Sequence, residues 1–145
     1  MRHQCKKHKL GRPQDQRKAV LRSLASSLFM HGEINTTLAK AKALKPYAEN
    51  IISLAKKGDL NSRRNALNLI FDQDTNKFMN PENGTVYESK EDAKENEKVV
   101  PETILRRLFN DVAKQYADRK GGYIRIFKMP PRRGDATPMA LIQLV

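Results

Sequence analysis

The sequence has little of what several protein classes require. Its 145 residues include one cysteine and no tryptophan, and aromatic residues make up 6%. The lone Cys5 excludes an internal disulfide framework and is typical of a reducing compartment. No apolar run reaches the roughly 18 residues that a membrane helix needs, and the first twelve residues lack the apolar core of a signal peptide. We therefore expect one folded domain that has no contact with a membrane.

Catalytic motifs are absent as well. There is no Gly-rich phosphate loop, no HExxH and no G-x-S-x-G, and the three histidines have no acid or nucleophile placed beside them. His3, Cys5 and His8 offer metal-ligand chemistry within one short stretch, but a structural zinc site takes four ligands at established spacing. We expect no enzyme, no metal, no cofactor and no small-molecule substrate.

Acidic residues are scarce relative to basic ones. The 28 Lys and Arg outnumber the 16 Asp and Glu, which leaves a formal charge of +12. Residues 1–71 carry 15 Lys and Arg against 4 Asp and Glu, residues 101–145 carry 9 against 4, and residues 72–100 carry 4 against 8. A polyanion relieves self-repulsion of this kind, so nucleic acid is the first partner class to consider.

We divide the chain into a basic arm over residues 1–12 and a domain over residues 13–145, with an acidic insertion at about 72–100. The arm has a single large aliphatic residue, Leu10, so it should become ordered only against a partner. Apolar periodicity predicts helices over about 15–31, 38–57, 60–71 and 101–119.

The third of these helices begins at a tight turn. Gly58 should end the preceding helix, which Pro46 should kink, and Asp59 should cap the third helix. We expect Leu60, Leu67 and Ile70 to face inward, with Arg63 and Arg64 facing out.

The acidic insertion is rich in turn residues. We expect an exposed excursion that is partly ordered at best, with Asn83-Gly84 as a possible hairpin turn between Phe78 and Tyr87. Pro101 should then open the last helix, with Glu102 in its first turn.

Three segments read as strands. They are a brief strand at residues 33–36 and two alternating runs at 123–129 and 138–145, which the PPRRGDA loop should join into an antiparallel hairpin. We expect the apolar residues of this hairpin to pack against the helices. The predicted fold is α+β and two-layered, in the order helix, strand, three helices, two strands, with a small mixed sheet packed on the helices.

The basic residues gather on the arm, on three helices with separate apolar faces, and on the hairpin turn. This distribution favours several phosphate contacts with a folded RNA, which a rigid domain with an arm would clamp. The alternative is a DNA-architectural or helix-turn-helix protein that uses KKGDLNSRRNAL as its turn and second helix. Against it, the Gly58-Asp59 junction is ordinary helix capping, and no dimerisation heptad is visible.

Over nearly its whole length the chain resembles the family of the seventeenth large-subunit protein of bacterial-type ribosomes. The resemblance rests on MRH, on GR followed by QRKAVLRSL, on INTTLAKAKALKP, on ISLAKKGDL-x-x-RR, and on RKGGYIRIFKMPPRRGDATPMALIQLV. It implies a non-enzymatic protein that binds the large (23S-type) rRNA on the solvent side, near the exit of the peptide tunnel, with other large-subunit ribosomal proteins as neighbours. It also implies the same element order as the periodicity.

The resemblance and the charge pattern together nominate the RNA-binding residues. Those in the matched motifs are Arg2, His3, Arg12, Arg17, Lys18, Arg22, Thr36, Thr37, Lys40, Lys42, Arg63, Arg64, Arg119, Gly121, Gly122, Tyr123, Arg125, Arg132 and Arg133. Charge adds Lys6, Lys7, Lys9, Lys45 and Lys120. We expect the hairpin turn to deliver its two arginines to RNA, and Gly121-Gly122 to allow a close approach of the backbone.

The chain also departs from the family pattern. Residues 5–8 fall in a variable part of the arm, residues 72–100 are longer than the usual link, and Lys45 stands where many members have Arg, which loses a two-pronged phosphate contact. The segment RPQDQRKAVLRSL resembles cyanobacterial and plastid members of the family more closely than enterobacterial ones. We therefore expect a ribosome of the bacterial cytoplasm or of an organelle matrix, with the plastid stroma as one option.

Overall fold

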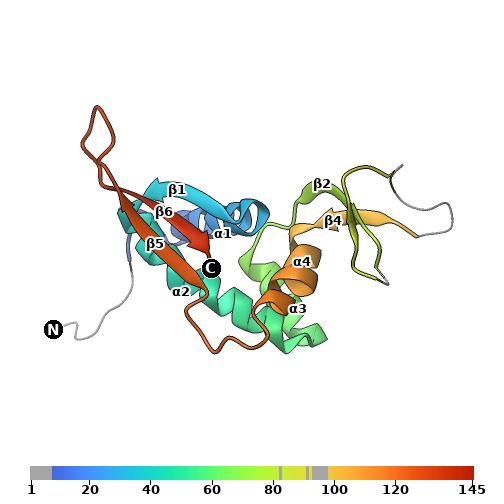
Figure 1. Ribbon diagram of the computed structural model, residues 1–145. Coiled ribbons are helices and arrows are strands. Elements are labelled where there is room, and N and C mark those ends of the chain that lie inside the picture. The colour runs from blue at the N-terminus through green and yellow to red at the C-terminus, as the bar shows by residue number, and fades with distance from the viewer. Residues whose placement is uncertain (1–7, 82, 91, 93–97) are drawn as a thin grey trace.

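The structure, a computed structural model, describes residues 8–81, 83–90, 92 and 98–145. Two small sheets lie toward opposite ends of the molecule, with helices between them (Figure 1). The elements in chain order are α1 (Gln14–His31), β1 (Glu33–Thr37), α2 (Leu38–Lys57), α3 (Leu60–Leu69), β2 (Asp74–Met79), β3 (Val86–Tyr87), β4 (Val100–Thr103), α4 (Ile104–Arg107), the π-helical turn η1 (Leu108–Val112), α5 (Ala113–Gln115), β5 (Ile124–Met129) and β6 (Met139–Leu144). The predicted α+β class is confirmed.

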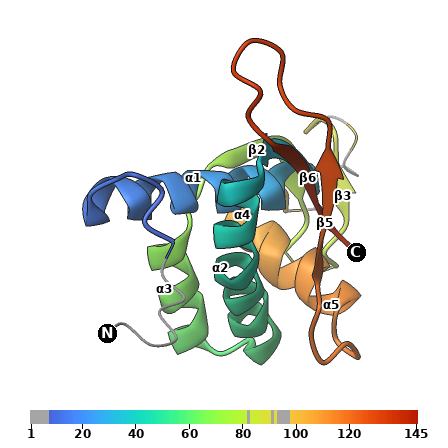
Figure 2. The same cartoon turned by 90° about the vertical axis from the view of Figure 1, so that its left-hand side faces the viewer.

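Helix α2 is the centre of the core (Figure 2). It runs for 20 residues through Pro46 and ends at Gly58, whose φ of 72° is the left-handed conformation that a glycine adopts without strain. Full burial of an aliphatic side chain stabilises the fold by roughly 2 kcal/mol, so this helix contributes much of the stability. Its buried residues are Ala41, Ala43, Leu44, Ala48, Ile51, Ile52 and Ala55.

Helix α3 turns a different face inward from the one predicted. Ile70, just beyond its end, is buried as expected, but Leu60 is 65% exposed and Leu67 is 44% exposed. Ser62 and Ala66 are buried instead. The buried face of α3 is thus the one with small side chains, which allow a neighbouring helix such as α2 to approach closely.

The main sheet has the strand order β1-β6-β5 and is antiparallel throughout. The prediction of a mixed sheet is therefore wrong, whereas the predicted β5–β6 hairpin is confirmed. The loop of residues 130–138 returns the chain from β5 to β6, which pair antiparallel, and β1 joins the free edge of β6, with Ile34 opposite Ile142. Helices α1 and α2 pack against one face of this sheet.

The acidic insertion contains more structure than the sequence suggested. Strands β2, β3 and β4 form a second antiparallel sheet in the order β3-β2-β4. Phe78 pairs with Tyr87, so the predicted hairpin at Asn83-Gly84 is confirmed. Met79 is 2% exposed, which ties β2 to the body of the protein.

The last helix starts three residues later than predicted. Pro101 lies in β4 opposite Phe78, and Glu102 is buried in that strand, where its carboxylate accepts a hydrogen bond from the Thr75 hydroxyl. Thr103 caps the helix by accepting from the Arg106 N–H at 3.4 Å. Pairing with β2 therefore takes Pro101 and Glu102 into a strand, although both suit a first helical turn.

Candidate nucleic-acid interface

Three segments that are distant in sequence meet at the first turn of α2. His8 of the arm, Thr37 to Ala39 and Lys42 of α2, and Thr137 and Pro138 of the hairpin line a cavity of about 440 Å³. Leu38 donates its backbone N–H to the Pro138 carbonyl at 2.9 Å, which holds the hairpin against the helix end. The described part of the arm adds the exposed side chains of Lys9 and Arg12. Arg2, His3, Lys6 and Lys7 lie outside the described residues.

The start of α2 carries positive potential. Its N-cap Thr37 makes no side-chain capping bond, and no acidic residue lies in its first turn. Apart from the Leu38 N–H, which is bonded to Pro138, the N–H groups of the first turn and the helix dipole make such an end favourable for anions. Lys40 is half-buried and Lys42 is exposed at this end, whereas Thr36 is buried. We therefore leave the Thr36 side chain out of the candidate surface.

The hairpin loop is held in shape by an ion pair. Arg132 donates two bonds to Asp135, from Nε at 3.1 Å and from an Nη at 2.6 Å, and Thr137 donates its hydroxyl to the same carboxylate at 2.6 Å. These donors hold the pKa of Asp135 well below its usual range. The Asp135 carboxylate thus offsets the charge of Arg132 locally. Arg133 is exposed, and its side chain makes no hydrogen bond or ion pair with the described residues.

The loop projects well beyond the body of the domain (Figure 2). Gly134 has a φ of 101° and Ala136 a φ of 49°, so the backbone at the tip is sharply turned. Arg133 lies at this projecting tip, whereas Arg132 is mainly a structural residue of the loop.

A second basic region lies at the other end of α2. The Lys56 ammonium donates to the Arg119 carbonyl at 2.6 Å and to the Tyr123 hydroxyl at 3.3 Å, and that hydroxyl donates to the same carbonyl at 3.1 Å. Tyr123 is only 5% exposed, so its side chain holds the turn together and offers no surface to a ligand. Sequence patterns did not single out Lys56, because its role depends on a chain segment more than sixty residues away.

The turn between Arg119 and Tyr123 is open to solvent. Lys120, Gly121 and Gly122 are exposed, and the φ of 67° at Gly122 favours glycine at that position. A Cβ at either glycine would meet no atom within 4 Å, so the space beside them is free. The positive φ at position 122 is therefore enough to explain why a glycine is found there.

The remaining candidate residues differ in how far their side chains are buried or engaged in contacts within the protein. Arg22 is half-buried, donates to the Ile70 carbonyl at 2.9 Å and lies 4.2 Å from the centre of the Phe71 ring. Arg63 lies over the Phe109 ring at 4.9 Å but is exposed. Arg17 and Lys45 are half-buried, and the exposed candidates are Lys18, Arg64 and Arg125.

The structure therefore gathers cations at two ends of one helix. The arm, Lys42 and the hairpin lie at the start of α2, and Arg119 and Lys120 lie at its end beside Lys56. A helix of 20 residues is roughly 30 Å long. The two cationic ends are thus about that far apart, and a folded polyanion that touches both must follow the length of the domain.

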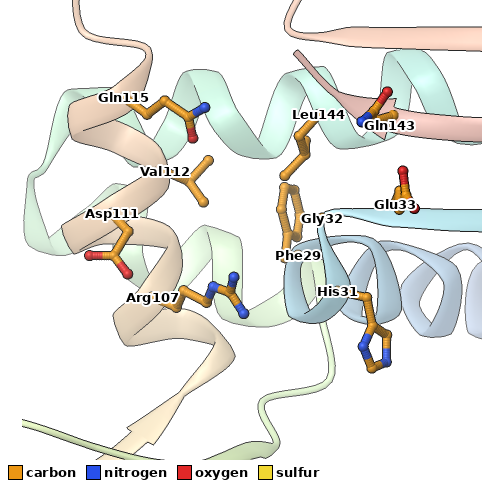
Figure 3. A pocket seen from close by; sticks show the side chains of 10 residues that line it. All are labelled: Phe29, His31, Gly32, Glu33, Arg107, Asp111, Val112, Gln115, Gln143 and Leu144. Atoms are coloured by element: carbon orange, nitrogen blue, oxygen red, sulfur yellow. The ribbon is translucent and has the colours of Figure 1, made fainter. Parts of the chain in front are cut away.

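A second cavity, of about 380 Å³, lies between the end of α1, the helix η1 and strand β6. Phe29, Val112 and Leu144 point toward one another across it, whereas the His31 ring points away (Figure 3). Arg107 donates to the Met30 carbonyl at 2.6 Å. Within the described chain, no hydrogen bond joins His31 to an acid, so this cavity holds no acid–base arrangement.

Neither a metal cluster nor a membrane helix occurs in the described ranges. Over residues 8–81, 83–90, 92 and 98–145, no three His, Cys, Asp or Glu side chains gather as metal ligands would. In the same residues, no helix combines the length and the apolar character needed to cross a bilayer.

The fold and the surface define a class: a small basic α+β protein with two separated cationic ends, suited to binding a folded polyanion. The family model described as Ribosomal protein L17 matches residues 20–145. The Large ribosomal subunit protein bL17 of Clostridium acetobutylicum is 40% identical over 137 residues, which cover 94% of this chain and 95% of that protein. The protein of the same name from Clostridium botulinum is 41% identical, with coverage of 94% and 96%. The chain belongs to the ribosomal protein L17 family, as the sequence motifs indicated.

Proposed function

We propose that this chain is a structural, non-catalytic constituent of the large ribosomal subunit that binds and clamps large-subunit rRNA. Membership of the ribosomal protein L17 family supports the ribosomal role. The single observation that carries the clamp is the separation of the two cationic ends along α2, roughly 30 Å for a helix of 20 residues. The phosphates of one RNA hairpin end, or those of two neighbouring RNA segments, would neutralise the cations at both ends of α2.

The mechanism is release of counterions from phosphate. Lys and Arg at each end displace condensed cations from RNA, so the logarithm of affinity falls linearly with the logarithm of salt concentration. Such contacts set orientation and register without reading bases. The β5–β6 loop and the glycine turn hold their cations on a rigid scaffold, which lowers the entropy lost on binding.

Paired charge removals test this proposal. Each phosphate contact contributes roughly 0.7 to 0.9 to the slope of log affinity against log salt. Lys42→Gln with Lys40→Gln should lower the slope by about 1.5 for binding to transcribed bacterial large-subunit rRNA, and Arg119→Gln with Lys120→Gln should do the same. The matched control is Lys77→Gln with Lys90→Gln, which removes two exposed cations from the second sheet region.

The control separates a clamp from general attraction. It should leave the slope unchanged, because Lys77 and Lys90 belong to neither cationic end of α2. Equal loss in all three double variants would mean that net charge alone drives binding, and would refute the clamp. Equal affinity for small-subunit rRNA or duplex DNA of the same length would count against the ribosomal assignment of the surface.

We extend the proposal to a position on the solvent side of the subunit, near the exit of the peptide tunnel and beside other ribosomal proteins. The family resemblance in the sequence supports it. Sedimentation of tagged protein through sucrose at moderate and then high salt, followed by crosslink sequencing, tests it. Crosslinks confined to rRNA far from the tunnel exit would contradict the position. Expression of the tagged protein in bacteria and in plastids, with recovery in the ribosomes of each measured, would distinguish a ribosome of the bacterial cytoplasm from one of an organelle matrix.

A further inference from the structure

The outer face of the β1-β6-β5 sheet carries apolar side chains that no helix among the described residues covers. Successive side chains alternate between the two faces, so the register gives the outer face three cross-strand rows. The first row is Arg125, Gln143 and Glu33, the second is Phe127, Leu141 and Asn35, and the third is Met129, Met139 and Thr37. In Figure 1 the helices that pack on this sheet lie behind it.

Only some of the apolar residues of the hairpin pack on the helices, so the expectation that all of them do so was wrong in part. Ile124, Ala140 and Ile142 do so and are nearly fully buried. Phe127 is 42% exposed and Met129 is 40% exposed, on the opposite face. The open face of an antiparallel sheet is usually polar, so two half-exposed apolar rows indicate a surface that is covered when the protein is bound.

The charges around the patch indicate what covers it. Arg125 stands two residues from Phe127 on the same strand and the same face, about 7 Å away along the strand. Beyond the other end of the patch the strands lead into the loop that bears Arg133. An aromatic ring on an open sheet, with one arginine beside it on the same strand and a second in the adjoining loop, is the kind of arrangement on which RNA-binding sheets stack unpaired bases.

The size of the patch argues against a protein partner as its main occupant. A stable protein interface takes roughly 800 Å² from each partner, far more than two half-exposed and two partly buried side chains supply. One nucleobase is of the right size. The only acid in the three rows, Glu33, lies on the far strand, away from Phe127.

We propose that Phe127 stacks an unpaired base of the rRNA on the outer face of the β1-β6-β5 sheet, with Arg125 holding a flanking phosphate and Arg133 contacting a phosphate further along the RNA strand. This inference rests on the proposed RNA-binding function and deepens it, since it adds a contact to a base beside the contacts to phosphate. Leu141 and Met129 form the apolar floor around the stacked base.

The sequence contains no tryptophan, so an introduced tryptophan is the only source of indole fluorescence and can report on base stacking. Phe127→Trp places a single indole on the patch, and Val86→Trp places one at a 39% exposed strand position in the acidic insertion, away from the nominated RNA-binding residues, as the matched control. Titration with protein-free bacterial large-subunit rRNA should quench the indole fluorescence of the Phe127→Trp variant by about half or more, since a stacked base quenches indole. The fluorescence of the control should stay nearly unchanged. Equal quenching in the two variants would overturn the inference.

A second variant covers the case in which the tryptophan disturbs the strand. Phe127→Leu keeps the site apolar and half-exposed but removes the aromatic face. Affinity should fall about tenfold at every salt concentration, with the salt slope unchanged, because stacking releases no counterions. Thermal melting by circular dichroism should match that of the unaltered protein.

The outcomes separate this inference from the function on which it rests. Tight binding by Phe127→Leu, equal to that of the unaltered protein, would overturn the stacking and leave the rRNA-binding function intact. Quenching of the Phe127→Trp variant only when other ribosomal proteins are added would assign the patch to a protein neighbour and overturn the inference. Failure of the unaltered chain to bind rRNA would overturn both.

Discussion

A single hydroxyl group joins two helical segments that are far apart in the sequence. Ser26 in α1 donates its hydroxyl to the Phe71 carbonyl at 3.0 Å and accepts from the Phe71 N–H at 2.8 Å. Ser26 is 3% exposed, and Phe71 follows α3 after the last helical residue. The hydroxyl thus satisfies both backbone groups of Phe71 at once, and we predict that Ser26→Ala destabilises the protein.

The magnitude follows from these two bonds. Each is worth about 1 kcal/mol net, and the alanine leaves both backbone groups of Phe71 without their partner. Phe71 as a residue is 36% exposed, so water reaches part of the site and limits the cost. We expect a loss of about 2 kcal/mol in the free energy of unfolding. For a chain of this length that corresponds to a fall in Tm of about 6 °C.

Because the protein has no tryptophan to report unfolding by fluorescence, equilibrium unfolding in urea followed by far-ultraviolet circular dichroism measures this loss. Ser53→Ala is the matched control, because the Ser53 hydroxyl donates to the Glu49 carbonyl at 2.9 Å on the exposed face of α2, within a single helix. Its loss should change the free energy of unfolding by less than about 0.5 kcal/mol. A shift for Ser26→Ala no larger than that of the control would refute the assignment of the two bonds as a stabilising link.

Three further predictions concern the arm, the insertion and the hairpin loop. Removal of residues 1–12 should weaken rRNA binding and flatten its salt dependence, as filter binding over a range of salt would report; an unchanged slope would show that the arm is no phosphate binder. Replacement of residues 81–98 by a short Gly-Ser linker, which keeps β2 and β4, should leave rRNA affinity unchanged or slightly raised, because net negative charge is removed. A large loss of affinity would locate RNA contacts there. Because Arg132 lowers the pKa of Asp135, the pair's contribution to stability is present above the ordinary carboxyl pKa of about 4 and is lost only as pH falls through the depressed value. Arg132→Gln should therefore raise the titration midpoint of Asp135 in carbon-detected NMR, and identical midpoints would refute the pairing.

Local sequence was a good guide wherever the deciding interactions lie within one segment. The bounds of α1 and α2 follow from apolar spacing and from glycine at each C-terminus, and the φ values of 81° at Gly32 and 72° at Gly58 explain that choice. The Asn83-Gly84 motif located the hairpin between Phe78 and Tyr87 correctly, but not its register: the Asn80 N–H donates to the Thr85 carbonyl, so the loop is longer than a two-residue turn and Phe78 pairs with Tyr87.

Local sequence was a poor guide where two patterns compete. Pro101 and Glu102 suit the first turn of a helix, yet both lie in β4, since β2 offers a partner strand and the Thr75 hydroxyl satisfies the Glu102 carboxylate. Nothing in residues 100–115 alone reveals that partner. The same holds for Arg22, whose charge suggested RNA and whose position against Phe71 depends on the end of α3.

The sequence by itself determined the charge, the family and the order of the main helices and strands, because these depend on composition, on motifs and on spacing within segments. Only the tertiary structure decided which stripe of α3 is buried, that the insertion forms a second sheet, and that cations collect at both ends of α2. It also left Phe127 and Met129 on an open sheet face, which alternation alone cannot distinguish from a buried one. The physical reason is that burial depends on which surfaces meet, and segments distant in the chain supply those surfaces.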